Sequence, residues 1–409
     1  MSDLKNIFYG DRVVQQAYLN DALIYQADSW TNTPSTMQLV SKSAVPLLRK
    51  TRGGVNVLFN SKNEMIVVDA QFIKYDGSNN IYNYRISKIN TDTSTVLYSS
   101  LSEQAGFNNR ITAYGGTNYV DREYAYIDKN DIIHLVYYRT LGTSSIINVY
   151  LLNITDTGTE FTTEVIKLDP SFALSVPYAV TFDDNYFYIS ILANNHYVVR
   201  AIDYGCKSYN EVITPTSWQI DSLFTTTDSV YLYGFSSNNN QVVQFNKYLW
   251  TAKIIYTTTF SYFTRMTGDN LNNLYFYATA WLSNDMSYRV DKYSTVNKTL
   301  TTFAANSRSY GQYYHFSFDG KYNIYTTGTD SYDGVSGAVF YKYKPDCNFA
   351  WGTREFSDIA NGSALRISDV FVDRNDSIYL LVPTNMTTQT NDYDYYIYKY
   401  INLEQVQNS

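Results

Sequence analysis

SFDGKYNIYTTGTDSYDGVSGAVFYKYKPDCNFAW, residues 317–351, reads as one complete structural unit. An apolar strand ends in a turn at Asp319-Gly320, and a second strand carries the pair Ile324-Tyr325. A polar loop then leads to a third strand that ends in Lys342-Tyr343, and a shorter fourth strand holds Trp351. Segments rich in Tyr, Ile, Val and Thr, separated by Gly, Asp and Asn, are typical of antiparallel β-structure.

The second strand of this unit recurs along the chain at intervals of 43 to 68 residues. Its aromatic or apolar position is occupied in turn by Ile66, His134, Tyr188, Tyr231, Tyr275, Tyr325 and Tyr379. A matching third strand follows each of these positions. A period of about 40 to 50 residues with four short strands per unit predicts the blades of a β-propeller.

We therefore expect an all-β protein, a seven-bladed β-propeller of four-stranded antiparallel blades over residues 53–402. The seventh unit has no clear fourth strand before the polar tail 403–409. The segment 37–43 (MQLVSKS) is expected to supply that strand and so remove an open sheet edge. A two-sheet sandwich built from the same hairpins is the alternative architecture.

Residues 1–27 contain three short apolar segments separated by the turn pairs Gly10-Asp11 and Asn20-Asp21. This pattern predicts a small N-terminal β-meander, which is too small to bury a core of its own. It must dock on the rest of the chain or on another protein, and residues 28–52 form a linker behind it. The expected docking residues are Ile7, Tyr9, Val13, Tyr18, Leu23 and Tyr25.

Two resemblances add to this interpretation. The sixth unit resembles the bacterial β-propeller repeat of the SBBP type, through Asn323-Ile324-Tyr325, Gly328-Thr329, Lys342-Tyr343, Pro345 and Trp351. Residues 4–25 resemble the short N-terminal modules of bacteriophage tail and baseplate structural proteins. The first implies the architecture and no activity, because a propeller hosts many functions. The second implies a virion protein that contacts other tail or baseplate proteins, usually as a homo-oligomer.

Composition and motifs exclude several classes of function. The net charge of −7 leaves no basic stripe for nucleic acid, and the 43 Tyr residues favour β-structure. We expect no secretory signal and no membrane-spanning segment. The nucleotide, hydrolase and zinc-protease motifs do not occur, so no catalytic residue, cofactor or metal site is expected. Cys206 and Cys347 match no ligand spacing.

His134 and His315 fall within expected strands and are interpreted as satisfied structural residues. Asp-rich turns such as 128–131, 183–185 and 373–376 recur at one place in the repeat without the spacing of a calcium loop. Turn chemistry alone accounts for such recurrence.

The longest polar loops are expected between second and third strands, at 75–82, 281–288, 330–337 and 384–395. The same connection faces the same way in every blade, so these loops share one face, and their aromatic and amide side chains suit sugars. The candidate binding residues are Tyr75, Tyr82, His196, Trp281, Asp285, Tyr332, Asp333 and Tyr393.

The sequence thus favours a non-enzymatic bacteriophage virion protein, which attaches through residues 1–27 and presents a propeller to host-surface polysaccharide. The alternatives are a purely architectural virion propeller, a glycan-active depolymerase and a bacterial extracellular binding protein.

Overall fold

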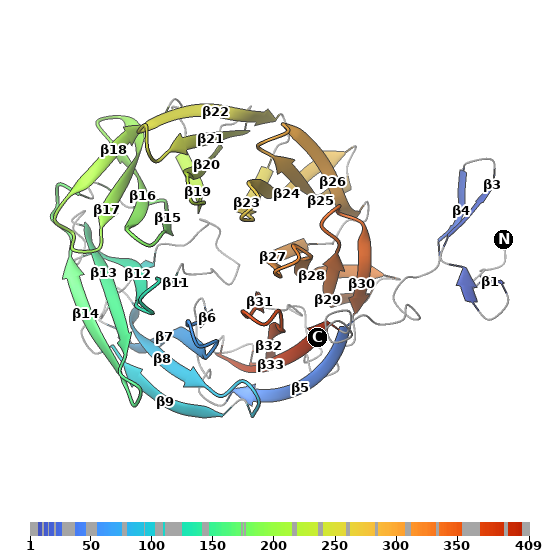
Figure 1. The fold of residues 1–409 in the computed structure, drawn as a ribbon, viewed down its shortest axis with the longest axis horizontal. Helices are drawn as coiled ribbons and strands as arrows, with labels where there is room; N and C mark the ends of the chain where they lie inside the picture. The colour runs from blue at the N-terminus through green and yellow to red at the C-terminus, as the bar shows by residue number, and fades with distance from the viewer. Residues whose placement is uncertain are drawn as a thin grey trace.

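A computed structural model shows seven antiparallel sheets arranged around a central axis, six of four strands and one of five (Figure 1). It describes residues 7–9, 12–14, 16–19, 22–26, 37–45, 55–75, 80–93, 95–102, 109–110, 125–140, 147–172, 175, 177–214, 219–235, 240–258, 262–282, 285–306, 312–332, 335–353, 369–387 and 392–402. The expected seven-bladed, all-β propeller is confirmed. All regular elements in these ranges are strands. No helix long and apolar enough to cross a membrane occurs among the described residues.

Blades 1 to 4 follow one another along the chain, each with its first strand nearest the axis. Blade 1 comprises β6 (Val55–Phe59), β7 (Met65–Tyr75), β8 (Asn80–Ile89) and β9 (Val96–Leu101). Blade 2 comprises β10 (Asn109–Arg110), β11 (Ala125–Ile127), β12 (Ile133–Thr140), β13 (Ile147–Asp156) and β14 (Phe161–Lys167). Blade 3 comprises β15 (Ala179–Phe182), β16 (Tyr186–Ala193), β17 (His196–Asp203) and β18 (Tyr209–Ile213). Blade 4 comprises β19 (Gln219–Thr225), β20 (Ser229–Phe235), β21 (Asn240–Asn246) and β22 (Thr251–Thr258).

Blades 5 to 7 complete the ring. In blade 2, the two short strands β10 and β11 both pair with β12. Blade 5 comprises β23 (Tyr262–Gly268), β24 (Asn273–Leu282), β25 (Asp285–Ser294) and β26 (Thr299–Asn306). Blade 6 comprises β27 (Gln312–Phe318), β28 (Ile324–Tyr332), β29 (Val335–Tyr343) and β30 (Phe349–Thr353). Blade 7 comprises β31 (Asp369–Val372), β32 (Ile378–Thr387), β33 (Asp392–Asn402) and β5 (Met37–Val45).

The ring is closed by the strand β5, which precedes blade 1 in sequence. β5 pairs antiparallel with β33, from Met37 opposite Asn402 to Val45 opposite Tyr395. It therefore provides the outermost strand of blade 7 at the segment where the sequence places a closing strand. Pairing gives backbone partners to an edge that would otherwise be open to other chains.

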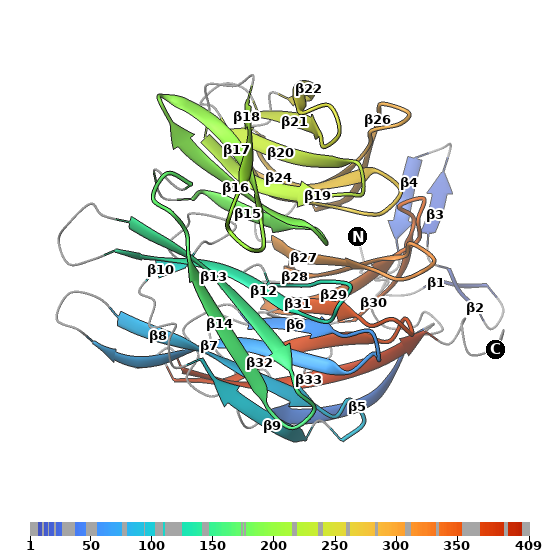
Figure 2. The same ribbon diagram turned by 60° about the vertical axis from the view of Figure 1, so that its left-hand side comes forward.

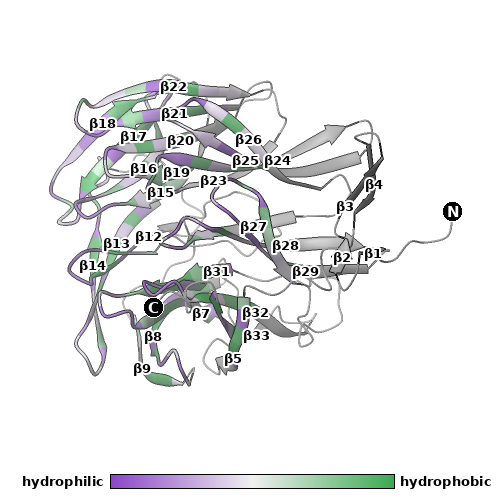
Figure 3. Ribbon diagram, turned by 45° about the vertical axis from the view of Figure 1, so that its right-hand side comes forward, coloured by the Kyte–Doolittle hydropathy of each residue, from purple (hydrophilic) through white to green (hydrophobic). Residues whose placement is uncertain are grey.

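Hydrophobic side chains pack between adjacent blades and form the core. Between blades 1 and 2, Val68 and Ile86 pack with Leu135 and Leu152, and all four are fully buried. Met37 of β5 joins the cluster between blades 6 and 7. Figure 3 shows hydrophobic residues along the strands of the blades. Each sheet is thus held by its neighbours, because a blade alone cannot bury both faces.

Antiparallel pairing gives the ring two distinct ends. The connections from first to second strand and from third to fourth strand lie at one end of the ring, which we call the turn end. Second-to-third connections lie at the other, which we call the hairpin end. Figure 2 shows the stacked blades obliquely.

The N-terminal segment forms two hairpins. β1 (Ile7–Tyr9) pairs with β2 (Arg12–Val14), and β3 (Gln16–Leu19) pairs with β4 (Ala22–Gln26). The sequence suggested three segments of one meander, whereas the structure divides the middle segment into β2 and β3. Both hairpins lie beside the ring (Figure 1).

Candidate functional site

An aspartate closes the first turn of most blades. In blade 6, Oδ1 of Asp319 accepts hydrogen bonds from the backbone N–H groups of Lys321 (3.0 Å) and Asn323 (2.8 Å). The same arrangement is made by Asp128, Asp183, Asp269 and Asp373. These carboxylates satisfy the N–H groups of their own turns, which explains why aspartate recurs at this position.

These turns are also linked to one another around the turn end. The N–H of Ser61 donates to Asp131 Oδ1 (2.7 Å) and that of Gly320 to Asp376 Oδ1 (2.6 Å), in each case across a blade boundary. Asp131 and Asp376 adopt positive φ values of 62° and 61°, a conformation that Asp tolerates. The first turns of neighbouring blades are therefore hydrogen-bonded to each other at these two boundaries.

The second oxygen of the turn aspartate accepts a hydrogen bond from the recurring tyrosine of the second strand. Tyr325 donates to Asp319 Oδ2 at 2.8 Å, and Tyr275 donates to Asp269 Oδ2 at 2.9 Å. Tyr188 and Tyr379 make the same bond to Asp183 and Asp373. Burial and the adjacent carboxylate raise the pKa of Tyr275, so its hydroxyl stays protonated and keeps donating.

A lysine of the third strand lies opposite the tyrosine in blades 5, 6 and 7. The register pairs Tyr275 with Lys292, Tyr325 with Lys342 and Tyr379 with Lys399. The ammonium of Lys292 lies 5.9 Å from the Tyr275 ring centroid, and that of Lys399 lies 5.7 Å from the Tyr379 ring. The repeat thus builds an Asp–Tyr–Lys unit beneath the first turn, which explains the Lys-Tyr ending of the third strand.

Lysines also serve the boundaries next to blades 1 and 3. Lys88 Nζ contacts Glu64 (2.7 Å) and Asp156 (3.0 Å), and although burial opposes its charge, these carboxylates raise the pKa of Lys88. Lys247 of blade 4 reaches back to blade 3, where its Nζ lies 2.6 Å from Asp183 Oδ2. An ammonium therefore recurs at the turn end from two different sequence positions.

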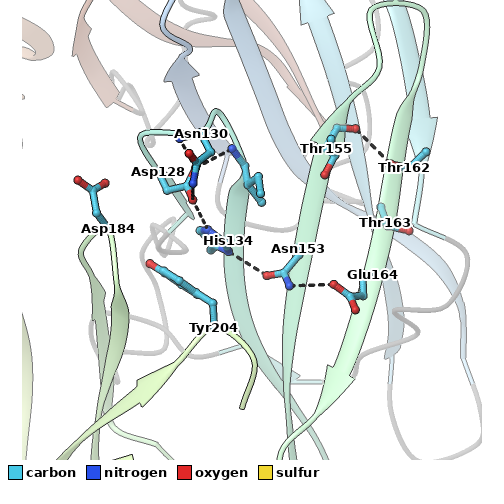
Figure 4. A pocket seen from close by; sticks show the side chains of 11 residues that line it. Asp128, Asn130, His134, Asn153, Thr155, Thr162, Thr163, Glu164, Asp184 and Tyr204 are labelled. Carbon is cyan, nitrogen blue, oxygen red and sulfur yellow. Dashed lines mark hydrogen bonds and ion pairs between the residues drawn. The ribbon is translucent and has the colours of Figure 1, made fainter. Parts of the chain in front are cut away.

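Blade 2 keeps the aspartate but replaces the other two residues of the unit. His134 stands in the tyrosine position, and Asn153 stands opposite it in the lysine position. The imidazole Nδ1 and Asn153 Oδ1 are 2.8 Å apart, and Asn153 Nδ2 donates to Glu164 at 3.2 Å (Figure 4). Because Glu164 holds the amide in this orientation, Nδ1 is the donor to Asn153 and Nε2 carries the lone pair of the neutral ring.

The other nitrogen of the imidazole, Nε2, faces Asp128. Nε2 of His134 is buried without a hydrogen-bond partner and lies 3.5 Å from Asp128 Oδ2. The ring of Tyr204, from blade 3, stacks on the imidazole at a centroid separation of 3.7 Å. Burial lowers the pKa of His134, and Asn153 and Asp128 oppose this only in part. Our expectation that His134 is a satisfied structural residue is therefore wrong for Nε2.

A cavity of about 410 Å³ lies beside this histidine, between blades 2 and 3 (Figure 4). Its lining is polar and consists of Asp128, Asn130, Ile132, His134, Asn153, Thr155, Thr162, Thr163, Glu164, Asp184 and Tyr204. The sequence analysis missed this site. The sequence did contain a signal for it. Comparison of blade 2 with blades 5 to 7 shows that the tyrosine and the lysine of the unit are both replaced by smaller side chains in blade 2.

The expected binding residues fall near the hairpin end, but the loops are shorter than predicted. β28 continues to Tyr332 and β29 begins at Val335, and the hairpins at 75–80, 282–285 and 387–392 are likewise extended. Polar side chains do not prevent pairing, because the ladder uses backbone groups alone. The predicted loops are therefore largely strand.

His196 is exposed directly after the tight turn of Asn194 and Asn195, both with positive φ. Six further candidates lie on strands, where the structure places their backbone alone: Tyr75, Tyr82, Trp281, Asp285, Tyr332 and Tyr393. Asp333 lies outside the described residues. The docking candidates Ile7, Tyr9, Val13, Tyr18, Leu23 and Tyr25 lie on β1 to β4, again as backbone.

Within the described ranges, no group of three or more His, Cys, Asp or Glu side chains is placed to hold a metal ion. Both cysteines, Cys206 and Cys347, are free thiols.

Comparison with known proteins supports the architecture. No known family model matches the chain, and no curated protein matches its sequence. Among solved structures, the Dos1 propeller is 9% identical over 88% of this chain and 94% of its own, with a TM-score of 0.51. The WD40 domain of coronin from Toxoplasma gondii is 11% identical over 88% of this chain and 86% of its own, also with a TM-score of 0.51. At such identity the likeness shows the fold, a β-propeller, and the SBBP repeat type stays a prediction.

Proposed function

We propose that the chain is a structural protein of a bacteriophage particle, which attaches through residues 1–27 and uses the propeller to bind polysaccharide on the host surface. It acts by binding and not by catalysis, and it resides in the virion, where several copies assemble.

The N-terminal hairpins carry this proposal. In the described part of the chain, β1 pairs with β2 and β3 with β4, and both hairpins lie beside the ring rather than within a blade (Figure 1). A two-stranded hairpin is marginally stable in water, so such a segment gains order from a partner. Its resemblance to phage tail and baseplate modules supports a virion protein as that partner.

Aromatic residues near the hairpin end support the binding role. Tyr75, Tyr82, Trp281, Tyr332 and Tyr393 all lie close to second-to-third connections. Rings at such positions can stack on the apolar faces of sugars, while neighbouring amides bind hydroxyl groups. A rigid ring that carries the hairpins of several blades at one end suits repeated contacts with a polymer.

Attachment is tested by comparing the full chain with residues 28–409 for incorporation into phage particles. The full chain should be incorporated, and the truncated one should stay free. Equal incorporation would contradict attachment through residues 1–27.

Binding is tested with the double variant Trp281→Ala/Tyr332→Ala against purified host-surface polysaccharide. The control is Tyr248→Ala, because Tyr248 is 69% exposed at the turn end. The double variant should bind at least tenfold more weakly and the control unchanged. Absence of binding by the unmodified protein would favour a purely architectural propeller, and release of oligosaccharide would favour a depolymerase. Detection of the protein on the surface of bacterial cells, and not in phage particles, would favour an extracellular binding protein.

A further inference from the structure

The cavity between blades 2 and 3 lacks a lysine at the repeat positions that serve the first turns of blades 3, 5, 6 and 7. In each other blade whose first turn is closed by an aspartate, a lysine stands at one of two repeat positions: opposite the second-strand tyrosine, or just after the third strand of the next blade. Blade 3 has Lys247, and blades 5, 6 and 7 have Lys292, Lys342 and Lys399. Blade 4, where Thr226 replaces the aspartate, has Gln244 in place of the lysine. A lysine at one of these positions therefore accompanies the turn aspartate. Lys247 contacts the aspartate itself, whereas the ammonium of Lys292 contacts the Pro345 carbonyl oxygen at 2.7 Å and that of Lys399 contacts Asp92 at 3.3 Å.

Blade 2 has the turn aspartate, but neither of these two repeat positions is a lysine. The lysine position opposite the second strand is Asn153, and the position that Lys247 occupies in blade 4 is Tyr204 in blade 3. Three carboxylates line the cavity, those of Asp128, Glu164 and Asp184, and no Lys or Arg is among the lining residues. Negative charge in a half-buried site calls for a neutralising partner.

His134 provides an independent sign that the site is incomplete. Its side chain is 3% exposed and lines the cavity, yet Nε2 has no hydrogen-bond partner. Buried polar atoms are rarely left in this state, and the usual remedy is a ligand or an ordered water. A donor placed between His134 and Asp128 would satisfy both groups at once.

We infer that this cavity binds a primary ammonium group carried by a hydroxylated molecule of monosaccharide size, that is, an amino sugar with a free amine. The ammonium takes the place of the missing lysine, beside Asp128. Lys247 shows the geometry that a tethered ammonium adopts at the next boundary, with Nζ 2.6 Å from both Asp183 Oδ2 and the carbonyl oxygen of Thr226.

The remaining lining suits the rest of such a molecule. Thr155, Thr162 and Thr163 carry hydroxyl groups that can exchange hydrogen bonds with those of a sugar. A volume of about 410 Å³ lies within the range of small-molecule sites. The cavity is at the turn end, opposite the hairpin end, so this inference does not depend on the proposed virion function.

The test uses the full chain and calorimetric titration with four probes. Glucosamine carries both the ammonium and the hydroxyls, glucose only the hydroxyls, N-acetylglucosamine a neutral amide, and 1,4-diaminobutane only ammonium groups. Glucosamine should bind at least tenfold more tightly than glucose or N-acetylglucosamine, and diaminobutane should compete with it. Equal binding of glucose and glucosamine, or no glucosamine binding, would overturn the inference.

Two variants locate the site, and a third is the control. Asn153→Lys restores the repeat's own ammonium and should weaken glucosamine binding at least tenfold while raising the melting temperature. Glu164→Gln should weaken it several-fold without filling the cavity. Glu160→Gln removes the same charge from an exposed residue of blade 2 that does not line the cavity, and should leave binding unchanged. Wild-type affinity in folded Asn153→Lys and Glu164→Gln would place the amine elsewhere and refute the assignment.

Discussion

The hydrogen bond between the repeat tyrosine and the turn aspartate makes a sharp prediction about stability. Tyr325→Phe removes the hydroxyl that donates to Asp319 Oδ2 at 2.8 Å, where the two residues are 0% and 4% exposed. The ring is kept, so no large cavity forms. A hydrogen bond to a charged group contributes about 1.5 to 3 kcal/mol. Asp319 Oδ2 retains a 2.7 Å bond from Asn323 Nδ2, so we expect a loss of about 1.5 to 2 kcal/mol, the lower part of that range.

The chain supplies a matched control in blade 4. Tyr231 occupies the same repeat position and is equally buried, but its hydroxyl contacts Asn272 Oδ1 at 3.5 Å and Gln244 Nε2 at 3.4 Å. These long contacts contribute little, so Tyr231→Phe should cost less than about 0.5 kcal/mol. Equilibrium unfolding in urea measures both variants. Equal losses for the two would refute the view that the Asp–Tyr bond stabilises the blade.

Three further predictions address other parts of the ring. Removal of residues 1–36 should preserve the melting temperature, whereas removal of residues 1–45 deletes β5 and should lower the melting temperature markedly and cause association. Circular dichroism measures the melting temperature and light scattering measures association; identical behaviour of the two truncated chains would contradict closure by β5. Gly268→Ala would place Cβ 2.4 Å from the Phe224 ring and 2.9 Å from the Asn273 carbonyl oxygen, so it should lower the free energy of unfolding by about 1 to 3 kcal/mol or more. Gly320→Ala should lower it less, because there the new methyl group meets the Asp376 carboxylate at 3.3 Å. Because burial lowers the pKa of His134 in the fold below 6.5, the unfolded chain binds the extra proton. The free energy of unfolding should therefore fall as pH drops below 6.5, by at most about 1.4 kcal/mol per pH unit, and His134→Gln should reduce this slope just below pH 6.5.

Most of the fold could be predicted because it follows from short-range patterns. The recurring tyrosine lies on the second strand in five blades, and the strand at residues 37–45 pairs with β33. The hairpin lengths could not be predicted in the same way. Residues such as Asp330 and Ser331 have turn-forming side chains, yet their backbones continue the ladder of β28, because a partner strand outweighs local preference.

The candidate site escaped prediction for a different reason. Neither His134 nor Asn153 belongs to a recognised motif, and 18 residues separate them in the sequence, although they lie opposite each other on the paired strands β12 and β13. Their significance depends on what stands at the same positions in other blades, and on Tyr204 of a neighbouring sheet. A departure from the repeat is visible in sequence, but the volume that it opens is a property of the packed ring.

The pairing of β5 with β33 also sets the order of events during translation. β5 is the first strand of the ring to leave the ribosome, and its partner, Asp392–Asn402, is the last. Blades 1 to 6 draw their strands from contiguous stretches and can form as they emerge. β5 must meanwhile remain unpaired through the synthesis of about 350 residues, so the nascent chain exposes a strand that only its own end can cover.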